Sequence, residues 1–266
     1  MNVYLHELRS YKKSTITWTI SLCAITVIFL LIYPSFSGNS EEIKKIFEAY
    51  PESVRKAFGI SIDGITSLLG FYSYVFLYVV LCGAIQAMNY GTSVISKETR
   101  DKTADFLLTK PVSRIQIITS KILAILTSIL ITNIIYLIVA FIMANLMKKE
   151  AFNVKIFFMI SFTLLFMQIL FIAIGILTSV ILPKIKSVIS VSLGTVFGLF
   201  IANMCASVIG EEAIRYITPF KYFDFPYIIK NGSYEVRFII LQIVLIVIAL
   251  IASYVIYVKK IQFNFY

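Results

Sequence analysis

Residues 122–147 read ILAILTSILITNIIYLIVAFIMANLM, a stretch of mostly apolar residues without any Asp, Glu, Lys, Arg or His. A helix that spans the hydrocarbon core of a bilayer needs about 20 such residues. A run this long and this apolar predicts a transmembrane helix rather than the core helix of a soluble domain.

The same pattern recurs in five further stretches, near residues 15–33, 68–92, 156–182, 187–209 and 237–258, whose apolar cores also lack Asp, Glu, Lys, Arg and His. The strands of a membrane β-barrel would instead be about 10 residues long, with alternating polarity. The chain is 59% hydrophobic and only 14% charged, whereas a soluble domain is about a quarter charged. We therefore expect an all-α integral membrane protein with six transmembrane helices.

The distribution of charge between the two sides of the membrane predicts the topology. Six spans place both termini on one side, and that side would hold 13 of the 24 Lys and Arg residues but only four of the 14 Asp and Glu residues. Short cytoplasmic loops are enriched in Lys and Arg. We expect both termini to be cytoplasmic, and the net charge of +10 then reflects this bias rather than binding to nucleic acid.

We expect the whole chain, residues 1–266, to form a single transmembrane domain. Residues 1–13 carry apolar side chains at helical spacing, which is typical of a helix in the membrane interface and also of a basic tail that anchors the first span. Residues 34–67 predict an amphipathic helix pair at the outer surface. Residues 210–236 form a second outer segment, whose aromatic side chains suit the headgroup level. The short link at residues 183–186 predicts that the fourth and fifth spans are packed neighbours.

The sequence lacks the motifs that are typical of nucleotide binding, of serine hydrolases and of metal sites. The chain has no G-x-x-x-x-G-K-[ST] phosphate loop, no G-x-S-x-G elbow, and a single histidine, His6, outside the spans. We therefore expect no enzyme activity, no metal site and no cofactor bound by this chain. Carriers driven by protons or cations usually place Asp, Glu or His in the bilayer, so the uncharged spans also argue against a secondary carrier.

Neutral amide side chains are the polar groups that remain inside the spans. In such positions they either line a translocation path or hydrogen-bond between helices, and the sequence leaves both interpretations open. The six candidates are Gln86, Asn89, Asn133, Gln168, Asn203 and Gln242.

Small residues recur every four positions along the fifth span and place a narrow stripe on one helix face. Such a stripe allows close approach of another helix, either within the chain or from another subunit. Its members are Ser190, Gly194, Gly198, Ala202 and Ala206.

Residues 96–114, SKETRDKTADFLLTKPVSR, form a charged island between the second and third spans. The pattern predicts a short amphipathic helix that stops before Pro111, because the residue before proline disfavours helix. Ser113 lies three positions before Gln116, the spacing of a capping box that begins the third span. The alternative is a solvated loop whose charges only enforce the topology.

The island resembles the most recognisable segment of the ABC-2-type permeases, the membrane subunits of bacterial ATP-driven exporters. Softer similarity covers residues 50–59 and 218–223, so that the resemblance runs along nearly the whole chain. In the island and the start of the third span the matching residues are Glu98, Thr103, Asp105, Phe106, Leu107, Leu108, Pro111, Val112, Ser113, Arg114 and Lys121.

The resemblance implies that residues 94–114 form a cytoplasmic coupling segment, whose helix docks on a separate ATPase. It further implies a permease subunit of an ATP-driven exporter in the bacterial plasma membrane, two soluble ABC ATPase subunits that bind ATP and Mg, and a second permease subunit, identical or related. The coupling residues would be Glu98, Arg100, Asp101, Lys102, Thr103, Asp105, Phe106, Leu107, Leu108, Pro111, Ser113 and Arg114. The alternative function is a membrane-embedded accessory, immunity or sensor protein that binds a partner without transporting.

Overall fold

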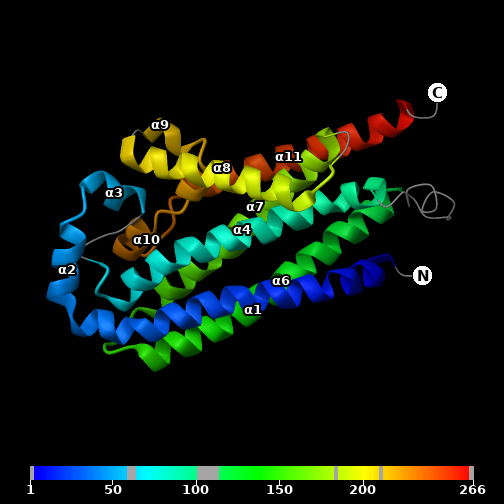
Figure 1. The fold of residues 1–266 in the computed structure, drawn as a ribbon. Helices are drawn as coiled ribbons and strands as arrows, with labels where there is room; N and C mark the ends of the chain where they lie inside the picture. The colour runs from blue at the N-terminus through cyan, green and yellow to red at the C-terminus, as the bar shows by residue number, and fades with distance from the viewer. Residues whose placement is uncertain (1–2, 59–63, 101–113, 183–184, 210–211, 264–266) are drawn as a thin grey trace.

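The computed structural model describes residues 3–58, 64–100, 114–182, 185–209 and 212–263, and it confirms the predicted all-α membrane fold (Figure 1). Within these residues, six helices are long and apolar enough to cross a membrane. They are α1 (Val3–Gly38), α4 (Leu68–Arg100), α6 (Arg114–Met147), α7 (Val154–Ile181), α8 (Val188–Ile209) and α11 (Val236–Phe263). No predicted span extends more than one residue beyond its helix.

Shorter elements connect the long helices. They are α2 (Ser40–Glu48), α3 (Glu52–Ala57), α9 (Glu212–Arg215), the 3-10 turn η1 (Pro219–Lys221) and α10 (Phe225–Asn231). In Figure 1, α2, α3, α9 and α10 lie at one end of the bundle, whereas the start of α1 and the end of α11 lie at the other. This arrangement matches an even number of crossings, which brings both termini to one side.

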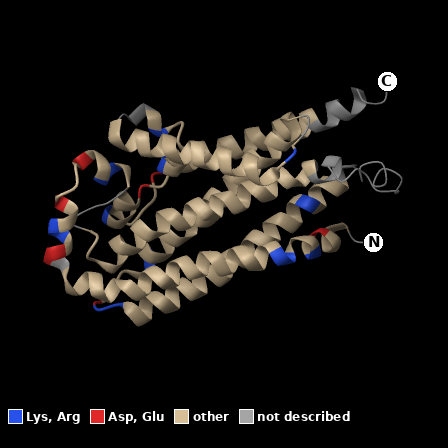
Figure 2. Cartoon of the chain, in the orientation of Figure 1, with Lys and Arg blue, Asp and Glu red and all other residues tan. Residues whose placement is uncertain are grey.

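Charged residues of the described chain gather at the two ends of the bundle, and the long middle parts of the helices carry almost none (Figure 2). At the end opposite the termini, α2 and α3 occupy the stretch predicted to carry amphipathic helices. Ile46 and Tyr50 are exposed there, whereas Phe47 packs partly against the core. Pro51 precedes α3 as its N-cap residue, because proline supplies no amide hydrogen to a helix.

The N-terminal segment differs from the separate interfacial helix that we predicted for residues 1–13. Residues from Val3 onward continue without a break into the first span as part of α1. The first proline within α1 is Pro34, so nothing earlier in the sequence interrupts the backbone hydrogen bonds. The hydroxyl of Tyr4 lies 3.0 Å from that of Thr127, and the hydroxyl of Tyr11 lies 2.9 Å from that of Ser93. These contacts hold the segment against α6 and α4.

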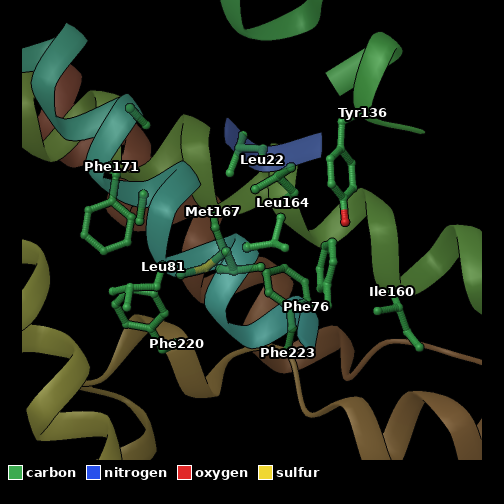
Figure 3. Packing of buried hydrophobic residues seen from close by; sticks show 14 of the residues in the cluster. Leu22, Phe76, Leu81, Tyr136, Ile160, Leu164, Met167, Phe171, Phe220 and Phe223 are labelled. Carbon is green, nitrogen blue, oxygen red and sulfur yellow. The ribbon is translucent and has the colours of Figure 1, made fainter. Parts of the chain in front are cut away.

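Helices α4 and α7 form the centre of the bundle and are the most deeply buried of the six spans. Their backbones are in contact where they cross, at Gly91 and Gly175. A Cβ atom built on Gly175 would lie 2.8 Å from the carbonyl oxygen of Met88 on α4. A Cβ atom built on Gly91 would clash with the carbonyl oxygen of Ile172 on α7. Only glycine permits an approach this close. Nearer the start of α4, large side chains such as Phe76 pack in the hydrophobic core (Figure 3).

The aromatic segment after α8 folds back onto the spans. Phe220 is buried, and the centroid of its ring lies 5.4 Å from the ring centroids of both Phe171 on α7 and Phe200 on α8. Phe223 stacks on Phe166 of α7 at 5.7 Å. Part of the predicted outer segment therefore belongs to the core of the bundle.

The prediction that the fourth and fifth spans are packed neighbours is wrong. Helix α8 packs mainly against α4 and α3 rather than against α7. Six residues separate the end of α7 from the start of α8. A chain of six residues can span up to about 20 Å, whereas neighbouring helices lie only about 8–10 Å apart, so the link does not force these two helices to pack together.

Candidate functional site

The described parts of the charged island are the end of α4 and the start of α6, which lie at the end of the bundle where α1 begins. Glu98 and Arg100 belong to the last turn of α4, and Arg114 is the first residue of α6. The other predicted coupling residues lie outside the described part of the chain: Asp101, Lys102, Thr103, Asp105, Phe106, Leu107, Leu108, Pro111 and Ser113. The coupling assignment therefore stays a prediction.

Lys121 joins three helices two turns below the island. Its ammonium donates a hydrogen bond to the carbonyl oxygen of Val94 on α4 at 2.9 Å and lies 4.0 Å from the carboxylate of Glu7 on α1. The Lys121 side chain is only 5% exposed, and Lys is almost never this buried unless it is paired. The base of the island is thus fixed to α1, α4 and α6 together.

Three of the six predicted amides meet in the centre of the bundle. Asn133 of α6 donates to the Gln168 side-chain oxygen of α7 at 2.6 Å, and Gln168 donates to the Gln86 oxygen of α4 at 3.1 Å. Gln86 donates to the Thr132 hydroxyl at 3.3 Å, which lies 3.0 Å from the hydroxyl of Thr19 on α1. We call Gln86, Asn133 and Gln168 the amide cluster.

The amide cluster fits the interpretation of hydrogen bonding between helices. Gln86 and Gln168 are fully buried, and Asn133 is 4% exposed. Their hydrogen bonds run from α1 through α6 and α4 to α7. Such bonds contribute on average about 0.6 kcal/mol each in membrane proteins, so the cluster sets the register of four helices more than it adds stability. A role in a translocation path remains a prediction.

The other three amides lie apart from the cluster. Gln242 of α11 donates to the backbone carbonyl of Phe166 on α7, and Asn89 is half-buried on α4. Asn203 of α8 lines a cavity, where its side-chain oxygen Oδ1 is buried without a hydrogen-bond partner among the described residues.

A second polar cluster was not singled out from the sequence. Thr26 of α1 donates to the Tyr136 hydroxyl of α6 at 3.1 Å, and the Tyr136 hydroxyl lies 3.2 Å from that of Tyr72 on α4. The Tyr72 hydroxyl lies 2.8 Å from that of Ser161 on α7. It ties the same four helices as the amide cluster. Its sequence signal was two tyrosines and two further hydroxyl residues inside apolar runs, because such polar groups need partners when they are buried.

The small-residue stripe of α8 points partly away from the chain. Ser190, Gly194 and Gly198 are exposed, Ala202 is half-buried and Ala206 is buried. A Cβ atom built on Gly194 or Gly198 would meet nothing within 4 Å among the described residues. The two glycines therefore do not serve packing within the described chain, in contrast to Gly91 and Gly175.

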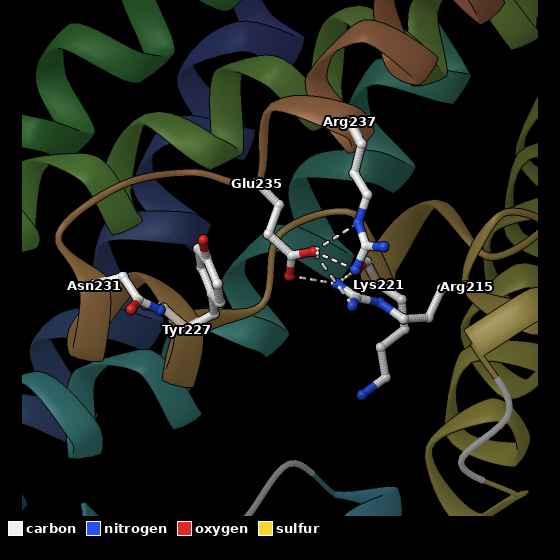
Figure 4. A network of polar contacts seen from close by, with 6 residues as sticks. All are labelled: Arg215, Lys221, Tyr227, Asn231, Glu235 and Arg237. Carbon is white, nitrogen blue, oxygen red and sulfur yellow. Dashed lines mark hydrogen bonds and ion pairs between the residues drawn. The ribbon is translucent and has the colours of Figure 1, made fainter.

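A charged cluster fastens the aromatic segment to the start of α11 (Figure 4). Arg215 donates to the Glu235 carboxylate at 2.9 Å and to the Lys221 carbonyl oxygen at 3.2 Å, and Arg237 donates to Glu235 at 3.0 Å. The guanidinium of Arg215 also lies over the Phe238 ring at 4.2 Å. Burial alone would raise the pKa of Glu235, but the hydrogen bonds from both arginines outweigh it and hold this pKa below its ordinary value.

A cavity of about 430 Å³ lies between α3, α4, α8, η1 and α10, at the end of the bundle opposite the termini. Its walls combine aromatic, amide, hydroxyl and charged side chains. They include Ser73, Tyr74, Leu77, Asn203, Ser207, Phe220, Lys221, Phe223, Asp224, Phe225 and Lys230.

These features define a multi-pass helical membrane protein, with polar clusters between its spans and a charged segment between its second and third spans. Residues 1–260 match the family described as ABC-2 family transporter protein. The chain therefore belongs to this family, as the resemblance of the island indicated, and is a permease component of an ABC transporter. Comparisons with curated proteins and with solved structures find no match.

Proposed function

We propose that the chain is the permease subunit of an ATP-driven exporter and that residues 94–114 receive the movement of a separate ATPase. The family match supports the transporter class. The observation that carries the coupling role is the buried Lys121, which links the base of the island to α1 and α4. A displacement of the island at this point would reach three spans at once.

The partners follow from this proposal. Two soluble ABC ATPase subunits bind ATP and Mg, and a second permease subunit, identical or related, completes the membrane part. The exposed Gly194 and Gly198 of α8 offer a face for that subunit, because glycines let another helix backbone approach closely. The protein lies in the bacterial plasma membrane with both termini in the cytoplasm, as the charge bias of the loops supports.

The test is purification of the tagged chain in mild detergent from its own cells, followed by identification of the proteins that accompany it. We expect a soluble subunit with a phosphate loop, and we expect the Leu107→Asp variant to lose it. The matched control is Ile46→Asp, which adds the same charge at an exposed position on α2, at the opposite end of the bundle.

The two variants separate docking from folding. A variant that enters the membrane normally but loses the ATPase supports the proposal, provided that the control retains it. Normal ATPase binding by Leu107→Asp contradicts the docking role. Recovery of membrane partners alone would favour the accessory or sensor function.

A further inference from the structure

The cavity between α8 and α10 has the size and lining of a binding site. Its volume of about 430 Å³ lies in the usual range of ligand pockets, about 300–1,000 Å³. Tyr74 and Leu77 of α4 contribute an apolar wall, and Phe220, Phe223 and Phe225 contribute another. Apolar walls with a few converging polar groups are typical of such sites.

The side-chain oxygen of Asn203 is a hydrogen-bond acceptor that receives no donor from the described residues. The residue is 4% exposed, and its Oδ1 atom has no partner among the described residues. Leaving a buried acceptor without a hydrogen bond costs about 1–3 kcal/mol. The neighbouring Ser207 hydroxyl does not serve it, because it donates to the Asn203 backbone oxygen at 2.8 Å. A hydroxyl group of a ligand would satisfy this atom.

The charges that line the cavity favour an anion. The net charge of the cavity lining is about +1, because it holds two lysines, Lys221 and Lys230, and one aspartate, Asp224. Burial lowers the pKa of Lys221, and the nearby Arg215 lowers it further, whereas Asp224 opposes the change. An anionic group beside Lys221 would offset the cost of keeping this half-buried ammonium charged.

The position of the cavity in the bundle indicates a ligand that comes from the membrane. Its polar lining lies where α8 ends, and the outer face of that part of α8 exposes apolar side chains such as Ile201 and Ile209. Lysines at the end of a span, beside aromatic rings, are typical of the headgroup level of a bilayer.

We propose that this cavity binds the headgroup of an anionic glycerophospholipid that carries free hydroxyl groups. The phosphodiester lies near Lys221 and Lys230, and a headgroup hydroxyl donates to Oδ1 of Asn203. A zwitterionic headgroup fits less well, because it would leave the net positive charge of the lining without a counter-ion. This binding does not depend on transport or on an ATPase, so it can be tested separately from the proposed function.

The test is native mass spectrometry of the delipidated, detergent-purified protein during titration with three lipids. Phosphatidylglycerol carries the charge and the hydroxyls, phosphatidylethanol carries the charge alone, and phosphatidylcholine has no net charge. For the wild-type chain we expect one tightly held phosphatidylglycerol, with a preference of roughly fivefold or more over phosphatidylethanol for the added hydrogen bond. We expect a further preference over phosphatidylcholine.

Two variants test separately the recognition of the headgroup hydroxyl and the recognition of the negative charge. Asn203→Leu should bind phosphatidylglycerol and phosphatidylethanol equally while still preferring both over phosphatidylcholine. The double variant Lys221→Met/Lys230→Met should lose the preference for anionic lipid. Lys45→Met, which removes an exposed cation of α2 away from the cavity lining, should behave as wild type.

Unchanged phosphatidylglycerol binding in both the Asn203 and the lysine variants would overturn the proposal, as would a wild-type preference for phosphatidylethanolamine over phosphatidylglycerol. The lysine variant keeps the test decisive if Asn203→Leu fails to fold, because Lys230 is exposed and Lys221 is only half-buried.

Discussion

The Lys121 ammonium lies 2.9 Å from the carbonyl oxygen of Val94, and this contact fixes α6 to α4 just below the charged island. A bond from a charged donor is about twice as strong as one between neutral groups. Glu7 approaches the same ammonium from α1 at 4.0 Å. The segment proposed to receive movement from an ATPase is therefore attached to a rigid junction of three helices.

Lys121→Met should destabilise the bundle by about 1.5–3 kcal/mol, the cost of losing a hydrogen bond from a charged group. Methionine preserves most of the apolar stem, so the change isolates the ammonium. Trp18, the only tryptophan of the chain, packs partly against the core of the bundle, and its fluorescence reports unfolding by denaturant in detergent. Lys45→Met is the control. Equal unfolding midpoints for Lys121→Met and wild type would show that the junction carries little energy.

Gln168→Leu should lower the free energy of unfolding by about 1–2 kcal/mol, because it removes two hydrogen bonds of the kind that reach at most about 1.7 kcal/mol in membranes. The loss leaves the Gln86 side-chain oxygen without its donor in the core, whereas the Asn133 amide keeps its bond to the Ile129 carbonyl oxygen. Asn89→Leu, at a half-buried amide outside the cluster, should cost less. A larger loss of unfolding free energy for Asn89→Leu than for Gln168→Leu would contradict the structural role of the amide cluster.

The amides illustrate where sequence reasoning ends. Each was visible as a polar side chain inside an apolar run, but all six looked alike. Which ones meet depends on how the helices rotate about their axes, and this rotation is set by side-chain packing between segments far apart in the chain. Gln86 and Gln168 are 82 positions apart, and no local spacing connects them.

The apolar part of each span was predictable, because the thickness of the bilayer fixes the length of each apolar run. The helices themselves extend further, and α1 begins 12 residues before its predicted span. The crossing of α4 and α7 was not, because Gly91 and Gly175 are isolated glycines on different helices. The regular stripe of α8 gave the stronger sequence signal, yet its exposed glycines contact nothing in the described chain. A small-residue pattern marks a face for close approach without saying what approaches.

Gly175→Ala should destabilise the bundle, because its new Cβ would lie 2.8 Å from both the Met88 carbonyl oxygen and the Thr92 amide nitrogen. These atoms belong to the backbone and cannot rotate away, so α4 and α7 must separate. Misfit in a packed core typically costs about 1–3 kcal/mol. Gly198→Ala is the matched control, since nothing lies near its new methyl group, and it should unfold at the wild-type midpoint or slightly above.

Gly198→Leu should instead affect association between permease subunits. The larger side chain would keep a second α8 at a distance and weaken a contact that depends on small residues. The measurement is the ratio of dimer to monomer after crosslinking in native membranes, with Ile201→Leu, an exposed change on the same helix, as the control. An unchanged ratio would assign the exposed stripe to lipid rather than to a subunit.

Glu235 should make the stability of the aromatic segment depend on acidity. Its pKa lies below the ordinary value of 4.5 because Arg215 and Arg237 bond its carboxylate. A carboxyl group with a lower pKa in the folded state stabilises the fold above the unfolded value and loses this contribution as the pH falls through the folded value. Glu235→Gln should therefore unfold more easily than wild type at pH 7, and the difference should shrink steadily below about pH 4.5. Glu42→Gln, at an exposed acidic residue of α2, is the control.

The outcome that would contradict this prediction is a stability difference between Glu235→Gln and wild type that stays constant from pH 7 into the acid range. It would mean that the charge of Glu235 does not hold this segment, and that the hydrogen bonds alone do.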